Sequence, residues 1–175
     1  MSRFFPHPGY AEDQPFSHTV LATHVLSRGF QAGAGFGSLL SIPIYLLRKP
    51  ASPPVPRLPF TPLLLRSAGN WSLVGSGLLS LALMGRMWDK EPIEWADRSW
   101  RLLENKGQVE CDDWGYSGAV LGAAATYFSG SIQRLGWRGF LGGTGLGSLA
   151  GVSGYMIWRH GINGGKWEED KSLSR

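Results

Sequence analysis

Charged positions cluster along this chain, and four long stretches between the clusters contain no Asp, Glu, Lys or Arg. Each stretch holds 19 or 20 residues: Gly29–Leu47, Ser67–Gly85, Trp114–Gln133 and Gly139–Trp158. A helix needs roughly 20 apolar residues to cross the ~30 Å hydrocarbon core of a bilayer. The pattern therefore predicts an all-α membrane protein with four spans, at about 18–47, 67–85, 114–133 and 139–158.

The segments outside the expected spans complete a single membrane domain of 175 residues. Residues 1–16 form a Pro- and aromatic-rich arm, and residues 48–66 hold six prolines, so both are expected to be extended. Residues 134–137 are expected to close a tight hairpin between the last two spans. Residues 159–175 form a polar tail after the fourth span.

Residues 86–113 differ from the other segments because they hold 13 charged residues and three tryptophans. Pro92 can start a helix there, and Lys106-Gly107 can end it. One face of that helix carries Ile93, Ala96, Trp100 and Leu103. We therefore expect a short amphipathic helix outside the hydrocarbon, within a charged loop between the second and third spans.

Small residues recur at every fourth position within the expected spans. The glycines concerned are Gly29, Gly33 and Gly37, then Gly118, Gly122 and Gly130, then Gly139, Gly143, Gly147 and Gly151. Helices in lipid associate through close backbone approach at such positions, which predicts a compact bundle with these glycines at helix contacts. A glycine-lined pore is one alternative. A buried soluble bundle is another, although each interior glycine costs roughly 1 kcal/mol relative to alanine in water.

The net charge of +4 is unevenly distributed over the two expected membrane faces. Segments 48–66 and 134–138 carry six basic residues and no acid, whereas the other face carries eleven basic and thirteen acidic residues. The density of positive charge favours the first face as the inner one. Its basic residues are expected to bind anionic phospholipid such as cardiolipin: Arg48, Lys49, Arg66, Arg134 and Arg138.

Two tryptophans of the charged loop, Trp95 and Trp100, are candidates for docking on a partner, since tryptophan is enriched at binding hot spots. They lie about 140° apart around a helix, so one narrow face cannot hold both. Anchoring of both indoles in lipid headgroups is the alternative interpretation.

Catalytic chemistry has little support in the sequence. The single cysteine, Cys111, excludes an intramolecular disulfide and a thiolate cluster. His18 and His24 are six residues apart and cannot jointly hold a metal on a helix, although either could pair with His160 as haem ligands in a quinone anchor. We expect no catalytic residue, no metal, no cofactor and no nucleic-acid partner.

The spans resemble the Tim-type family of mitochondrial inner-membrane proteins in the motifs GFQAGAGFG, GYSGAVLGAAATYFSG and GFLGGTGLGSLAGVSG. The flanks MSRFFPHPGYAEDQPF, RKPASPPVPRLPF, WDKEPIEWADRSWRLLENKGQVECDDW and YMIWRHGINGGKWEED resemble the NUXM family of fungal complex I accessory subunits. The resemblance implies a non-catalytic subunit in the membrane arm of NADH:ubiquinone oxidoreductase, supporting assembly and stability beside other membrane-arm subunits. Its termini would face the intermembrane space. A protein translocase subunit is the alternative within the same family.

Overall fold

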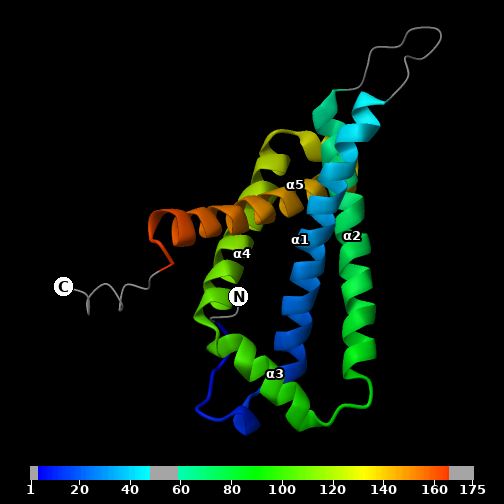
Figure 1. The fold of residues 1–175 in the computed structure, drawn as a ribbon. Coiled ribbons are helices and arrows are strands. Elements are labelled where there is room, and N and C mark those ends of the chain that lie inside the picture. Colours follow the sequence, from blue (N-terminus) through cyan, green and yellow to red (C-terminus); the bar gives the residue numbers. More distant parts are fainter. Residues whose placement is uncertain (1–3, 48–58, 166–175) are drawn as a thin grey trace, which may run out of the picture.

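The computed structural model describes residues 4–47 and 59–165, and this part of the chain is helical without a strand (Figure 1). The all-α prediction is therefore confirmed. The elements in chain order are η2 (Ala11–Asp13), α1 (Ser17–Leu46), α2 (Phe60–Met87), α3 (Pro92–Glu104), α4 (Lys106–Phe128), α5 (Ser131–Met156) and η3 (Ile157–Ile162). Arg48 and Lys49, expected to bind lipid, lie outside the described residues.

Three of the expected spans have different ends in the structure. Helix α2 begins at Phe60, inside the segment predicted to be an extended linker, and α4 begins at Lys106, inside the segment predicted to be a loop. Asn105 makes the second start possible, because its side chain accepts a hydrogen bond from the Gln108 backbone N–H at 3.1 Å. The absence of charge marks the apolar part of each helix, and in α4 a hydrogen-bonded cap sets the start of the helix outside that part.

The hairpin between the last two helices, predicted at residues 134–137, lies earlier in the structure. The chain reverses at Ser129–Gly130, where Gly130 has a φ of 67°. Gly136 then kinks α5 with a φ of 65° and a ψ of −162°. Both backbone conformations favour glycine, which has no Cβ to clash at positive φ. Gly130 is therefore a turn residue, and its predicted role as a glycine inside a helix contact is wrong.

The predicted amphipathic helix is present as α3. Pro92 occupies its first turn, and Glu91 and Glu94 form a reciprocal capping box. The Lys90 side chain, which is bonded to Glu94, holds the pKa of that exposed carboxyl below its ordinary value. Helix α3 thus begins where its sequence indicates, and it ends at Glu104.

Helices α1 and α2 pack as an antiparallel pair through backbone contact (Figure 1). Gly29 faces the Gly75 carbonyl, Gly33 faces the Trp71 carbonyl, and Gly37 faces the Ser67 carbonyl. A methyl group added at any of these glycines would collide with the α2 backbone. The absence of a side chain is therefore what allows the two helices to approach so closely.

Helices α4 and α5 form a second pair of the same kind. Gly118 and Gly122 on α4 meet Gly143, Gly147 and Gly151 on α5, again with carbonyl oxygens where a Cβ would stand. Gly139, by contrast, faces the side chain of Leu135 in its own helix. The α4–α5 interface therefore consists of residues at every fourth position of both helices, over about two helical turns.

Helix α5 joins the two pairs by crossing α1 and α2 (Figure 1). Gly142 lies against the Leu65 carbonyl of α2, and Gly145 lies between Ala34 of α1 and Ser72 of α2. Gly69, Gly75, Gly142 and Gly145 make close contacts that lie outside the every-fourth-residue series. The packing of α5 against α1 and α2 accounts for Gly69, Gly142 and Gly145, whereas Gly75 belongs to the α1–α2 contact.

The interior of this assembly contains small side chains, and many large apolar side chains lie outside. Among the described residues, Ser41, Ser72 and Ser99 are completely buried, and few large apolar side chains, such as Met87 and Tyr155, are buried with them. In contrast, Leu121 is 71% exposed and Phe128 is 83% exposed. Within residues 4–47 and 59–165, no helix reaches both the length and the mean apolarity of a membrane span.

Glycine substitutions at packed and open positions should change stability in opposite directions. Gly33→Ala should lower the free energy of unfolding by about 1–3 kcal/mol, because the added methyl group overpacks the α1–α2 contact. Gly77→Ala, on the same pair of helices, meets no atom within 4 Å. It should raise stability by up to ~1 kcal/mol through helix propensity. Thermal unfolding of the purified variants measures both, and a stabilising Gly33→Ala would contradict the packing.

Candidate functional site

A buried ion-pair cluster connects α1 to α4. Its centre is Asp112, whose side chain is only 2% exposed. Arg28 Nη2 donates to Asp112 Oδ1 at 2.7 Å, and His24 Nδ1 lies 3.0 Å from Asp112 Oδ2. Both carboxylate oxygens therefore have a partner on α1. We call this ion pair and the side chains bonded to it the polar cluster; its members are His24, Arg28, Gln31, Gln108, Cys111, Asp112 and Ser148.

Hydrogen bonds extend the polar cluster across the helices to α5. Arg28 Nη1 donates to Gln31 Oε1 at 2.9 Å, and Gln31 Nε2 donates to Ser148 Oγ of α5 at 2.9 Å. On α4, Arg28 Nη2 also donates to Gln108 Oε1 at 3.2 Å. Cys111 Sγ accepts from Arg28 Nη1 at 3.6 Å. The Arg28 guanidinium thus bonds to groups on α1 and α4, and the Gln31 amide connects it to α5.

Helical spacing explains why these side chains meet. His24, Arg28 and Gln31 recur at i, i+4 and i+7, which is one face of α1. Gln108 and Asp112 are likewise four residues apart on α4. Small residues leave room for the amide, since a Cβ on Gly115 would lie 2.8 Å from Gln31 Nε2. Polar spacing and a glycine together create the space for the polar cluster.

The polar cluster has the chemistry of a helix clamp. A buried carboxylate loses its hydration, and the loss is offset only where charged and hydrogen-bonded partners replace the water. Such a set holds its members in one geometry, so α1 and α4 are fixed in register. Within the described residues, no group of three His, Cys, Asp or Glu side chains could hold a metal ion.

The sequence analysis did not predict this site, because it assigned no role to Arg28 or Asp112. The predicted charged loop, residues 86–113, also placed Asp112 outside the bundle. In the structure, α4 begins eight residues before the apolar stretch, so Asp112 lies on a helix that faces α1. The i, i+4, i+7 polar spacing on α1 was the available signal.

The expected docking tryptophans contact other parts of this chain. Trp95 stacks on the ring of His18 at 4.2 Å between centroids. Trp100 lies 5.3 Å from the ring of His7, and its Nε1 donates to the Pro8 carbonyl at 2.8 Å. His7 Nε2 is also 2.6 Å from Glu104 Oε2. Trp100 therefore helps to hold the N-terminal arm on α3, whereas Trp95 connects α3 to the start of α1.

The expected lipid-binding arginines within the described residues are all exposed. Arg134 Nη2 donates to the Ser129 carbonyl at 3.1 Å, next to the turn between α4 and α5. The Arg138 guanidinium lies 5.3 Å from the ring centroid of Trp137. Arg66 lies in the second turn of α2. These arginines are therefore accessible, and their binding of anionic phospholipid stays a prediction.

The candidate haem-ligating histidines have different surroundings. His18 stacks on Trp95 of α3, His24 is bonded to Asp112 of α4, and His160 is exposed in η3. Each histidine therefore has different neighbours, and the described structure gives no support for any two of them as ligands of one haem.

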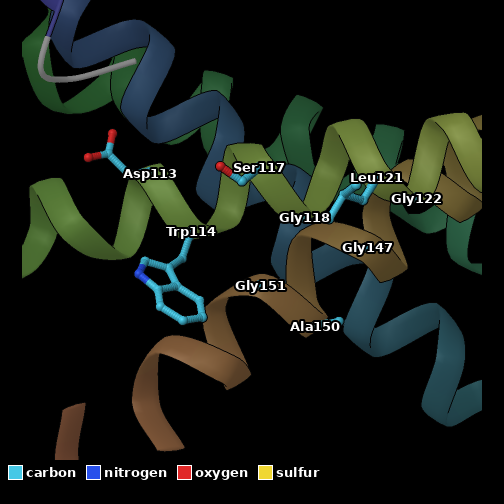
Figure 2. Close-up of a pocket in the computed structure, with 9 residues that line it drawn as sticks. All are labelled: Asp113, Trp114, Ser117, Gly118, Leu121, Gly122, Gly147, Ala150 and Gly151. Atoms are coloured by element: carbon cyan, nitrogen blue, oxygen red, sulfur yellow. The ribbon is translucent and has the colours of Figure 1, made fainter. Parts of the chain in front are cut away.

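A groove of about 610 Å³ lies between α4 and α5 (Figure 2). Glycines form much of its lining, and Asp113 and Trp114 lie at one end. Its remaining lining residues are Ser117, Gly118, Leu121, Gly122, Gly147, Ala150 and Gly151. The groove is mostly apolar and is distinct from the polar cluster.

Comparisons of this chain with protein-family models, with curated proteins and with solved structures find no match.

Removal of the Asp112 carboxylate should be strongly destabilising. Asp112→Ala leaves the Arg28 guanidinium without its buried partner, and breaking such a pair costs about 3–5 kcal/mol. Asp97→Ala is the matched control, because Asp97 forms an exposed pair with Arg101 on α3 at 3.0 Å and such pairs contribute about 0–1 kcal/mol. Denaturant unfolding of both variants measures the difference. Equal losses would refute the clamp.

Loss of the Trp100 hydrogen bond should loosen the N-terminal arm. Trp100→Phe keeps an aromatic ring but cannot donate to the Pro8 carbonyl, so chymotrypsin should cut faster after Tyr10, which is 74% exposed. Trp88→Phe is the control, since Trp88 is also 74% exposed and lies outside the arm contact. If both variants are cut at the wild-type rate, the indole does not hold the arm.

Proposed function

We propose that this chain is an integral protein of the mitochondrial inner membrane and a non-catalytic accessory subunit in the membrane arm of NADH:ubiquinone oxidoreductase. In this proposal α1, α2, α4 and α5 form a compact bundle of four small-residue-rich transmembrane helices, and α3 lies outside the hydrocarbon. The termini face the intermembrane space.

The observation that carries the membrane assignment is the reversed distribution of side-chain size. Glycine, alanine and serine fill the helix contacts, while leucine, isoleucine and phenylalanine cover much of the outside. On soluble proteins, large exposed apolar patches mark contact with a partner or a membrane. In lipid the same arrangement is favourable, because helices there associate by close packing rather than by burying leucine.

The low mean hydropathy of the helices is compatible with this proposal. A window average counts both faces of a helix, and here one face consists largely of glycine and serine, which lower the mean. The α2 residues Leu73, Leu78, Leu81 and Met84 are exposed to the surroundings, whereas Ser72 on the same helix is buried. The side that lipid would meet is thus more apolar than the average indicates.

An accessory role is supported by the chemistry of the buried groups. The polar cluster is internally bonded, with Asp112 and Gln31 both buried, and it holds helices in position. The assignment to this particular complex comes from the resemblance of the span and flank motifs. A translocase subunit of the same Tim-type family is the second candidate, because the glycine-rich motifs that pack here are the ones that carry that resemblance.

Two measurements on mitochondrial membranes test the proposal. Alkaline carbonate should leave the protein in the membrane pellet, because only integral proteins resist it. A native gel of membranes solubilised in mild detergent should then show the protein at the position of NADH dehydrogenase activity. Release into the carbonate supernatant would refute the membrane assignment. Migration with a translocase would favour the second candidate.

A further inference from the structure

The crossing of α2 and α5 brings together two arginines that are far apart in the sequence (Figure 1). A Cβ on Gly69 of α2 would meet the Arg138 carbonyl, and a Cβ on Gly142 of α5 would meet the Leu65 carbonyl. Arg66 directly follows Leu65, and both arginines are exposed. The two segments that carry them are therefore in backbone contact.

Helical geometry places both arginines on the same side of this crossing. Each residue is rotated by about 100° from the one before it, so Arg66 flanks the α2 face that Leu65 presents to α5. Gly69, which meets Arg138, is rotated about 40° from Leu65 toward Arg66, whereas Ser72, which meets Gly145, is rotated about 20° the other way. Arg138 therefore lies on the side to which Arg66 points.

The positive charge of this pair is not neutralised within the described residues. None of the ion pairs there includes Arg66 or Arg138. The Arg138 guanidinium lies only over the ring of Trp137, with 5.3 Å to its centroid. The sequence contains no Asp or Glu at positions 14–88 or 114–167, which include both crossing segments. Two exposed cations without a nearby acid attract an anion.

The arginine on α2 begins a row of three exposed side chains. Arg66, Asn70 and Leu73 stand at i, i+4 and i+7, which is one face of the helix. The Asn70 amide makes no hydrogen bond to another group within the described residues, and Leu73 is 46% exposed. From Arg66 into the charge-free stretch, the face presents a cation, then an amide, then an apolar side chain. A phospholipid presents a phosphate, an ester carbonyl and an acyl chain in the same order.

From this geometry we propose that this face of α2, together with Arg138 of α5, binds an anionic phospholipid. The two guanidiniums donate to the phosphate oxygens, for which their planar N–H groups are suited. The Asn70 amide donates to an ester carbonyl, and an acyl chain lies along Leu73. The assignment to a lipid rests on the proposed function, which places Arg66 at the headgroup level and Leu73 in the hydrocarbon.

Native mass spectrometry of the purified full chain in detergent tests the headgroup, with equal amounts of dioleoyl phosphatidylglycerol and dioleoyl phosphatidylcholine. The wild-type protein should retain the glycerol lipid in preference. Arg66→Gln should lower the ratio of retained glycerol lipid to choline lipid about fivefold, since it removes one cation beside the phosphate. Arg86→Gln is the matched control and should leave the ratio unaltered, because Arg86 is exposed at the other end of the same helix.

Variants of Asn70 test the ester contact separately from the charge. Asn70→Leu should reduce retention of both lipids severalfold without changing their ratio, because the ester is common to both. Asn70→Gln keeps an amide on the same face and should retain more lipid than Asn70→Leu. Both substitutions are at an exposed position, and circular dichroism verifies that the helices have formed. Wild-type retention in Asn70→Leu would refute the ester contact.

Three other outcomes would overturn the site. Equal retention of the two lipids by the wild-type protein would exclude a preference for an anionic headgroup. Equal effects of Arg66→Gln and Arg86→Gln would show general attraction to positive charge. Binding of glycerol 3-phosphate but of neither lipid, lost in Arg66→Gln, would give the site to a soluble anion. All are measured on isolated protein, so their failure is separate from release by carbonate, which would refute the membrane assignment itself.

Discussion

Close contact between helix backbones is the constraint on which the rest of this structure depends. Where Gly33 meets the Trp71 carbonyl, or Gly118 meets the Gly147 carbonyl, no space remains for even a methyl group. Contact at this range brings many backbone atoms together, and each pair adds a small dispersion attraction. The same contact leaves no space for large side chains along these helix interfaces, so many of them project outward. The small interior, the apolar exterior and the open groove between α4 and α5 follow from it.

The polar cluster links the two glycine-packed helix pairs, because it bonds α1 of one pair to α4 and α5 of the other. The bonds from Arg28 and His24 to Asp112 exist in a single register of α1 against α4. A buried polar group can select one arrangement among several of similar packing energy, and the Gln31–Ser148 bond extends the selection to α5.

The N-terminal arm and the start of α1 are organised around α3. The N-terminal arm reaches it through the carbonyl of Pro8 and the ring of His7, and His18 at the start of α1 stacks on Trp95. Both tryptophans therefore connect segments of this chain. This explains how a helix with many charges keeps its indoles half-buried, and it places α3 as a brace across the lower ends of α1 and α4 (Figure 1).

The sequence by itself determined the helical class, the position of α3 and which glycines in α1, α4 and α5 could permit close approach, because helical periodicity is a local property. It did not determine that Gly130 and Gly136 form a turn and a kink, since their positive φ values depend on how α5 folds back over α1 and α2. Nor could it pair Asp112 with Arg28, 84 residues away. Such a pair depends on which helix faces meet, and tertiary packing alone decides that.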